Sequence, residues 1–145
     1  MVMDTEDNAW MQMSLVSVIA KSFRSQLRVG KYWRRNAWET ACNGLIACGA
    51  GMREAGPVDA KCYALIADIA LEYLRCKQNR SPKRVDELYR IIRDDFKAFR
   101  ASVQMLESFM TRQECSYLSE ARTSCITNML ELDLLKEELV SPDTG

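Results

Sequence analysis

The chain has 145 residues, a formal net charge of zero, 48% hydrophobic residues and 28% charged residues, which are the length and composition of one globular domain. It contains no histidine, and this excludes a histidine-dependent hydrolase and a Cys/His zinc site. No hydrophobic run is long enough to cross a bilayer, and the amino terminus is acidic where an export signal is basic. We therefore expect a cytoplasmic protein.

Apolar residues recur at spacings of three and four almost throughout, and only six glycines and three prolines interrupt them. This spacing is the helical period rather than the strand period. The sequence therefore predicts an all-α, single-domain, compact helical bundle of about five to seven helices over residues 1–140. A flexible tail is predicted at 141–145.

The first half of the chain contains three predicted helices. The first has apolar positions over 10–27 and ends near Gly30. The second covers 38–52 and is closed by Gly56, because glycine readily adopts the left-handed backbone past a helix end. The third begins at Pro57, since proline is tolerated in the first helical turn.

The second half contains the clearest helix start, at Ser81 and Pro82, where an N-cap serine precedes a proline at the first helical position. The apolar stripe then continues over 85–110, longer than a typical globular helix. The sequence leaves open one long helix or two helices with a kink near Ala98. A last helix is predicted over 118–139.

Six cysteines are spread along the chain without a Cys-x-x-Cys pair, and four of them stand among apolar helical neighbours. We interpret them as reduced core residues. Cys48 is not expected to act as a nucleophile, because the chain has no histidine to serve as its base. Without a nucleotide loop or a serine-centred motif, the sequence predicts no catalytic residues and no enzyme.

Basic residues gather over 21–35 and over 75–84. The first cluster ends in a basic aromatic segment composed of Lys31, Tyr32, Trp33, Arg34 and Arg35. Cations interleaved with aromatic rings suit a protein partner, an anionic membrane surface or, with the second cluster, a nucleic acid. The simplest alternative is a solvated helix face with two core aromatics.

Carboxylates flank the turn after the second predicted helix as Glu54 and Asp59, and others lie on the last helix as Asp133 and Glu137. Calcium and magnesium prefer oxygen ligands. These four residues are therefore the candidate ligands of a Ca or Mg site, if the two acidic helix ends meet. The alternative is that acidic residues at a helix start only interact favourably with the positive end of the helix dipole.

Small residues, Gly44 among them, line one face of the second predicted helix. They let another helix approach closely, although glycine costs helix stability. Close packing within the chain is the simplest interpretation. The functional alternative is a groove that docks a partner helix, with Gly44 as a contact.

Four features occur in a fixed order: a Gly-Lys-Tyr step at 30–32, the small-residue helix, an acidic glycine-containing turn followed by Val58-Asp59, and an amphipathic helix at 85–88. This order resembles the TerB-like tellurite-resistance family over about residues 27–96. The resemblance implies an all-helical fold and divalent metal at the acidic turn. It also implies a non-catalytic cytoplasmic module that acts through protein partners at the inner membrane face, in stress-resistance or phage-defence systems.

Overall fold

The computed structural model describes residues 17–30, 32–55, 57–106 and 112–140. A helical segment at 17–27 is followed in chain order by β1 (Arg28–Val29), β2 (Tyr32–Trp33), α2 (Ala37–Ala55), α3 (Pro57–Arg75), the short 3₁₀ helix η1 (Lys77–Asn79), α4 (Pro82–Leu106) and α5 (Arg112–Val140). The predicted all-α class is confirmed. Within these ranges the β structure is limited to one small hairpin.

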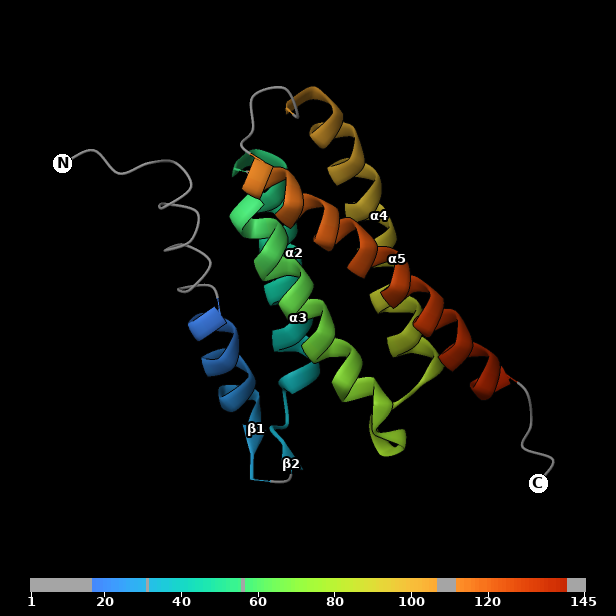
Figure 1. The fold of residues 1–145 in the computed structure, drawn as a ribbon. Coiled ribbons are helices and arrows are strands. Elements are labelled where there is room, and N and C mark those ends of the chain that lie inside the picture. The colour runs from blue at the N-terminus through green and yellow to red at the C-terminus, as the bar shows by residue number, and fades with distance from the viewer. Residues whose placement is uncertain (1–16, 31, 56, 107–111, 141–145) are drawn as a thin grey trace.

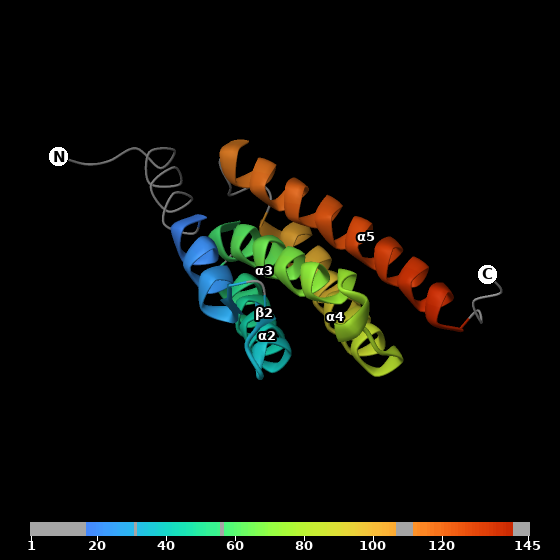
Figure 2. The same ribbon diagram turned by 90° about the horizontal axis from the view of Figure 1, so that it is seen from below.

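The helices form one bundle (Figures 1 and 2). α3 packs between α2 and α5, and α5 lies across α3 and α4 with its outer side uncovered (Figure 2). Segment 17–27 packs on the opposite side, beside α2 and α3. None of the described helices is both long and apolar enough to cross a membrane.

Two of the predicted helix starts are confirmed. α3 begins at Pro57 and α4 at Pro82. The Ser81 hydroxyl accepts a hydrogen bond from the Arg84 backbone N–H at 3.2 Å, which is the interaction expected of an N-cap. The stripe that begins at Val85 lies on one continuous helix as far as Leu106, so Ala98 does not divide it.

The segment after the first helix differs from the prediction. Helix ends at Leu27, and the chain reverses in an antiparallel hairpin whose pairs are Arg28 with Trp33 and Val29 with Tyr32. The reversal occurs at Gly30, whose φ of 61° lies in the left-handed region that glycine adopts without strain. The basic aromatic segment is therefore part of a β-hairpin.

The core lies where α2, α3, α4 and α5 meet. Its largest fully buried side chains are Tyr63, Leu45, Ile69, Leu71, Leu74, Leu88, Ile92, Leu132, Val85 and Cys125. Burial raises the pKa of the Cys125 thiol to about 12, and burial together with nearby Glu87 does the same for Cys42. These two cysteines are protonated core thiols at neutral pH, as the sequence predicts. Three predicted features lie outside the described residues: the start of the first helix (10–16), the end of the apolar stripe (107–111) and the tail (141–145).

Candidate functional site

The hairpin projects at one end of the bundle (Figure 1) and has two different faces, because cross-strand partners point to the same side of a strand pair. The Arg28–Trp33 pair faces the bundle: the Arg28 guanidinium lies 5.0 Å from the centre of the Trp33 ring. Trp33 packs against Tyr73 of α3 in a T-shaped arrangement, with 5.3 Å between ring centres. Arg28 Nη1 also contacts Glu72 Oε1 at 2.9 Å. Trp33 and Arg28 therefore anchor the hairpin.

The other pair faces solvent. Val29 is 55% exposed and Tyr32 74% exposed, and the exposed Arg34 and Arg35 follow directly. No described carboxylate lies within ion-pair distance of either arginine. We call Val29, Tyr32, Arg34 and Arg35 the hairpin surface. The predicted contact Lys31 lies outside the described residues.

Two other cations of the first basic cluster, Arg24 and Arg28, are already paired. Glu72 of α3 accepts both Arg24, at 3.3 Å, and Arg28. These contacts fasten segment 17–27 and the hairpin to α3. They separate Arg24 and Arg28 from the two exposed arginines that follow them in the sequence.

The arginines of the second basic cluster are also engaged within the chain. Arg75 contacts both carboxylate oxygens of Glu131 on α5, at 2.9 and 3.1 Å. The nearly buried Arg80 donates to the Leu74 carbonyl at 2.9 Å, to the Arg75 carbonyl at 3.3 Å and to Glu138 at 2.6 Å. Such contacts satisfy carbonyls at the end of α3 that have no helical partner. The cluster therefore joins α3, η1 and α5.

The predicted metal site stays a prediction, because two of its four ligands have side chains outside the described residues. Lys61 pairs with Glu120 and Arg75 with Glu131, so α3 and α5 run side by side in the same direction. Glu54 and Asp59 belong to the helix ends at the start of α3, and their side chains lie outside the description. The exposed Asp133 and Glu137 lie 13 or more positions beyond the Lys61 contact, about 20 Å along α5.

The described residues also contain no group of three or more carboxylates and thiols arranged to hold a metal ion. Asp133 and Glu137 are one turn apart on an exposed helix face, which supplies two carboxylates at most. Two carboxylates are fewer protein ligands than calcium takes, and magnesium would need waters or a phosphate to complete its shell.

The small-residue face of α2 is filled by the chain itself. A Cβ at Gly44 would lie 3.3 Å from Phe23 Cζ and 3.8 Å from Ile66 Cδ1. At Gly49 it would lie 2.7 Å from Asp95 Oδ2. The glycines thus allow close internal packing, and the space that the docking-groove alternative assigned to a partner helix at Gly44 holds Phe23.

The sequence analysis did not single out Asp95, although it is the one buried carboxylate of the described residues. Its Oδ2 accepts a hydrogen bond from the Tyr63 hydroxyl at 2.9 Å, in the space that Gly49 leaves open where α2, α3 and α4 meet. One signal was present: Asp95 stands seven residues after Leu88 and three after Ile92, which places it on the buried stripe of α4.

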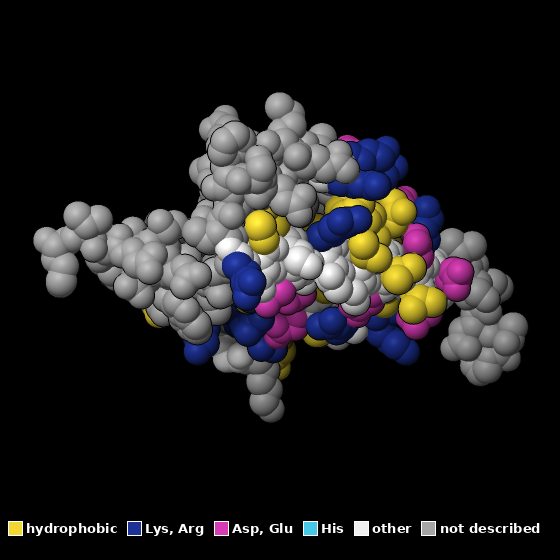
Figure 3. All heavy atoms as spheres, turned by 45° about the horizontal axis from the view of Figure 1, so that its top comes forward, with side chains coloured by type: hydrophobic (Ala, Val, Ile, Leu, Met, Phe, Trp, Pro, Cys, Tyr) yellow, Lys and Arg dark blue, Asp and Glu magenta, His cyan; other side chains and the backbone are white. Residues whose placement is uncertain are grey.

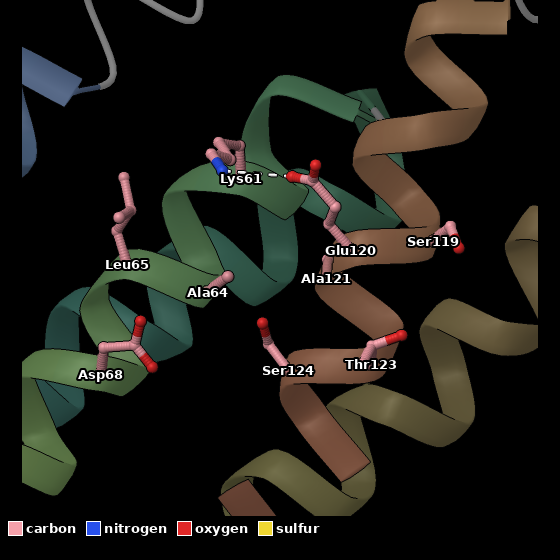
Figure 4. A pocket seen from close by; sticks show the side chains of 9 residues that line it. All are labelled: Lys61, Ala64, Leu65, Asp68, Ser119, Glu120, Ala121, Thr123 and Ser124. Carbon is pink, nitrogen blue, oxygen red and sulfur yellow. Dashed lines mark hydrogen bonds and ion pairs between the residues drawn. The ribbon is translucent and has the colours of Figure 1, made fainter. Parts of the chain in front are cut away.

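An open groove of about 520 Å³ separates α3 from α5 (Figure 4). It is lined by Lys61, Ala64, Leu65, Asp68, Ser119, Glu120, Ala121, Thr123 and Ser124. Lys61 Nζ contacts Glu120 Oε2 across it at 3.2 Å, and Asp68 and Ser124 point into the gap (Figure 4).

Partial burial raises the pKa of Asp68, and this outweighs the opposing effect of Arg75 and Arg24. No hydrogen bond joins a lining hydroxyl to a lining carboxylate, and an activated nucleophile needs a base within hydrogen-bond reach. The groove therefore has no assembled catalytic pair among the described residues.

A further exposed feature is an apolar stripe on the outer side of α5. Ile126, Leu130 and Leu134 are spaced four residues apart and are 42%, 61% and 61% exposed. Figure 3 shows hydrophobic side chains gathered on this side of the molecule, among charged ones. This stripe and the hairpin surface each combine exposed apolar side chains with neighbouring charge.

Comparison with protein-family models, with curated proteins and with solved structures finds no match to this chain. The structure alone defines the class of this protein, which is an all-helical bundle with a small hairpin.

Proposed function

We propose that this chain is a non-catalytic helical module that binds a protein partner through the hairpin surface. The observation that carries the proposal is the joint exposure of Val29 and Tyr32 beside two arginines that have no described ion-pair partner. Tyrosine and arginine are enriched at the centres of protein interfaces, where they contribute a large share of the binding energy.

The chemistry of this surface indicates the kind of partner. Free guanidinium groups bind carboxylates through two parallel hydrogen bonds, so we expect an acidic segment that also offers an apolar side chain to Tyr32. The hairpin is anchored by the Trp33–Tyr73 contact and the Arg28–Glu72 ion pair. Such preorganisation lowers the entropy lost when a surface binds.

An anionic membrane surface is the alternative that uses the same residues, because each arginine near such a surface contributes about 1 kcal/mol. A nucleic acid is favoured less, since Arg75 and Arg80 of the second cluster are held by α5 carboxylates. The proposal keeps the cytoplasmic setting and the stress-resistance or defence role that follow from the TerB-like resemblance alone. It does not include a divalent metal.

The test uses two double variants of equal charge change. R34E/R35E reverses the charge of the hairpin surface, and K77E/K83E reverses that of two exposed lysines of the second basic cluster. A photo-crosslinking amino acid at Tyr32, introduced in cells, captures the bound protein, which is then purified for calorimetry. We expect R34E/R35E to weaken its binding at least tenfold and K77E/K83E to leave it unchanged.

Equal effects of the two double variants would refute the hairpin as the contact surface. The same variants are tested on vesicles containing 30% phosphatidylserine and on duplex DNA over a range of salt concentrations. Hairpin-dependent vesicle binding without a captured protein would replace the protein partner with a membrane. A steep fall of DNA affinity with salt in the unmodified protein, made shallower by both double variants, would favour nucleic acid.

A further inference from the structure

Two half-buried cysteines face each other between α2 and α3. The thiol of Cys48 donates a hydrogen bond to the sulfur of Cys62, with 3.3 Å between the two sulfur atoms. Among the six cysteines, all of which lie in described residues, this is the one pair in sulfur-to-sulfur contact. We propose that Cys48 and Cys62 form an oxidation site, at which a peroxide converts the two thiols into a disulfide joining α2 to α3.

The geometry favours this bond over any other in the chain. A disulfide has sulfur atoms about 2.05 Å apart, so the two sulfurs need to approach by about 1.2 Å. α2 and α3 are packed together along their length, which holds the two residues in place. Cys42 and Cys125, by contrast, are buried and have thiol pKa values of about 12.

The two steps of the reaction are balanced. The reaction needs no histidine base, because the fraction of one thiol that ionises in water supplies the thiolate. This thiolate attacks a peroxide oxygen, the O–O bond breaks, and a sulfenic acid and hydroxide form. The second sulfur attacks the sulfenic sulfur, so that the S–S bond forms as the S–O bond breaks and the departing hydroxide takes up the thiol proton as water. Two thiols lose two electrons in total and the peroxide gains them.

The exposure of the two cysteines supports the peroxide step, and the contact between their sulfur atoms supports the disulfide-forming step. Both cysteines are only partly buried, so a small peroxide can reach them. Because the second thiol already contacts the first, the bond-forming step is intramolecular and competes well with further oxidation. The site does not depend on the hairpin surface, and it adds a redox property to the proposed binding function.

The disulfide should also stabilise the fold. The two residues are 14 positions apart, and closing a loop of that length raises the melting temperature by roughly 10 °C for a chain of this size. The bond would enclose the turn between the helices. Reduction with dithiothreitol should reverse the rise.

The experiment treats the full-length reduced protein with hydrogen peroxide, then alkylates the remaining thiols with N-ethylmaleimide and digests with trypsin. Cleavage at arginine and lysine separates residues 36–53 from residues 62–75, so the disulfide appears as a linked pair of these peptides. Fragmentation distinguishes Cys48 from Cys42 in the first peptide. We expect the linked pair and the reversible rise in melting temperature.

The variants C48S and C62A should each abolish both signals, while C76S/C115S should retain them. Having two different single variants keeps the test valid if one of them fails to fold. Full alkylation of Cys48 and Cys62 after peroxide treatment, with oxidation confined to Cys76 and Cys115, would overturn the proposal. So would a linked peptide found only in covalent dimers.

Discussion

Gly49 gives the most direct test of the packing described above, because two opposing effects act on its replacement by alanine. Gly49 lies inside α2, and alanine is the better helix former there. Its added Cβ, however, would lie 2.7 Å from Asp95 Oδ2, 2.9 Å from Asp95 Cγ and 3.0 Å from Asp95 Oδ1. The carboxylate is 8% exposed and bound by Tyr63, so it cannot swing into solvent without loss.

The structure decides which effect is larger. Helix propensity favours alanine by about 1 kcal/mol. Overpacking a filled site costs about 1–3 kcal/mol, and disturbing a hydrogen bond to a charged group costs a further 1.5–3 kcal/mol or so. We therefore expect Gly49→Ala to lower the free energy of unfolding by roughly 1.5–5 kcal/mol.

Urea unfolding followed by circular dichroism measures this change. Ala50→Gly, at the exposed neighbouring position, is the matched control, and its expected loss of about 1 kcal/mol reports helix propensity alone. Tyr63→Phe removes the hydroxyl that binds Asp95, so the penalty of Gly49→Ala should shrink in that background. A Gly49→Ala protein as stable as the unmodified chain would refute the close approach of α2 to Asp95.

Three further outcomes are expected, each measured by urea unfolding. Leu132→Ala, at a fully buried position of α5, should cost about 2–5 kcal/mol, whereas Leu130→Ala, 61% exposed, should cost less than about 1 kcal/mol; equal losses would contradict the orientation of α5. Arg80→Ala should cost about 1–3 kcal/mol through the α3 carbonyls it leaves without a donor, and a neutral result would show that water replaces the guanidinium. The pKa of Asp68 is raised above its ordinary 3.8 in the folded protein, so the fold is favoured by protonation. Asp68→Asn should therefore increase stability at pH 7, and the difference should vanish as the pH falls below 3.8; an increase that persists at low pH would contradict burial as its cause.

Local chemistry accounts for the parts of the fold that the sequence predicts correctly. Helix starts at Pro57 and Pro82 depend on a ring that fixes φ and on a missing N–H, both of which are properties of a single residue. The Ser81 cap needs only the following turn. The hairpin was missed because Arg28 and Val29 continue an otherwise helical pattern, and Gly30 alone does not distinguish a helix end from a β-turn.

The candidate site was less predictable because it depends on contacts between distant segments. Tyr32 and Trp33 are adjacent aromatic residues, yet one is exposed and the other packs on Tyr73, forty positions away. That division follows from the strand period of two, which two-residue strands are too short to reveal in a sequence. The parallel alignment of α3 and α5 is likewise set by contacts between distant segments, which periodicity does not specify.

The ion pairs also determine which charge reversals can test function. Arg28 belongs to the same sequence cluster as Arg34, but it holds Glu72 and covers the Trp33 ring. Reversing its charge would place a second carboxylate beside that of Glu72 and release the hairpin, so a loss of binding would report a loss of structure. Arg34 makes its contacts to the fold through its backbone, by donating to the Leu27 carbonyl and accepting from the Ala37 N–H. Its side chain can therefore be reversed with the hairpin intact, and a binding defect in R34E/R35E separates recognition from folding.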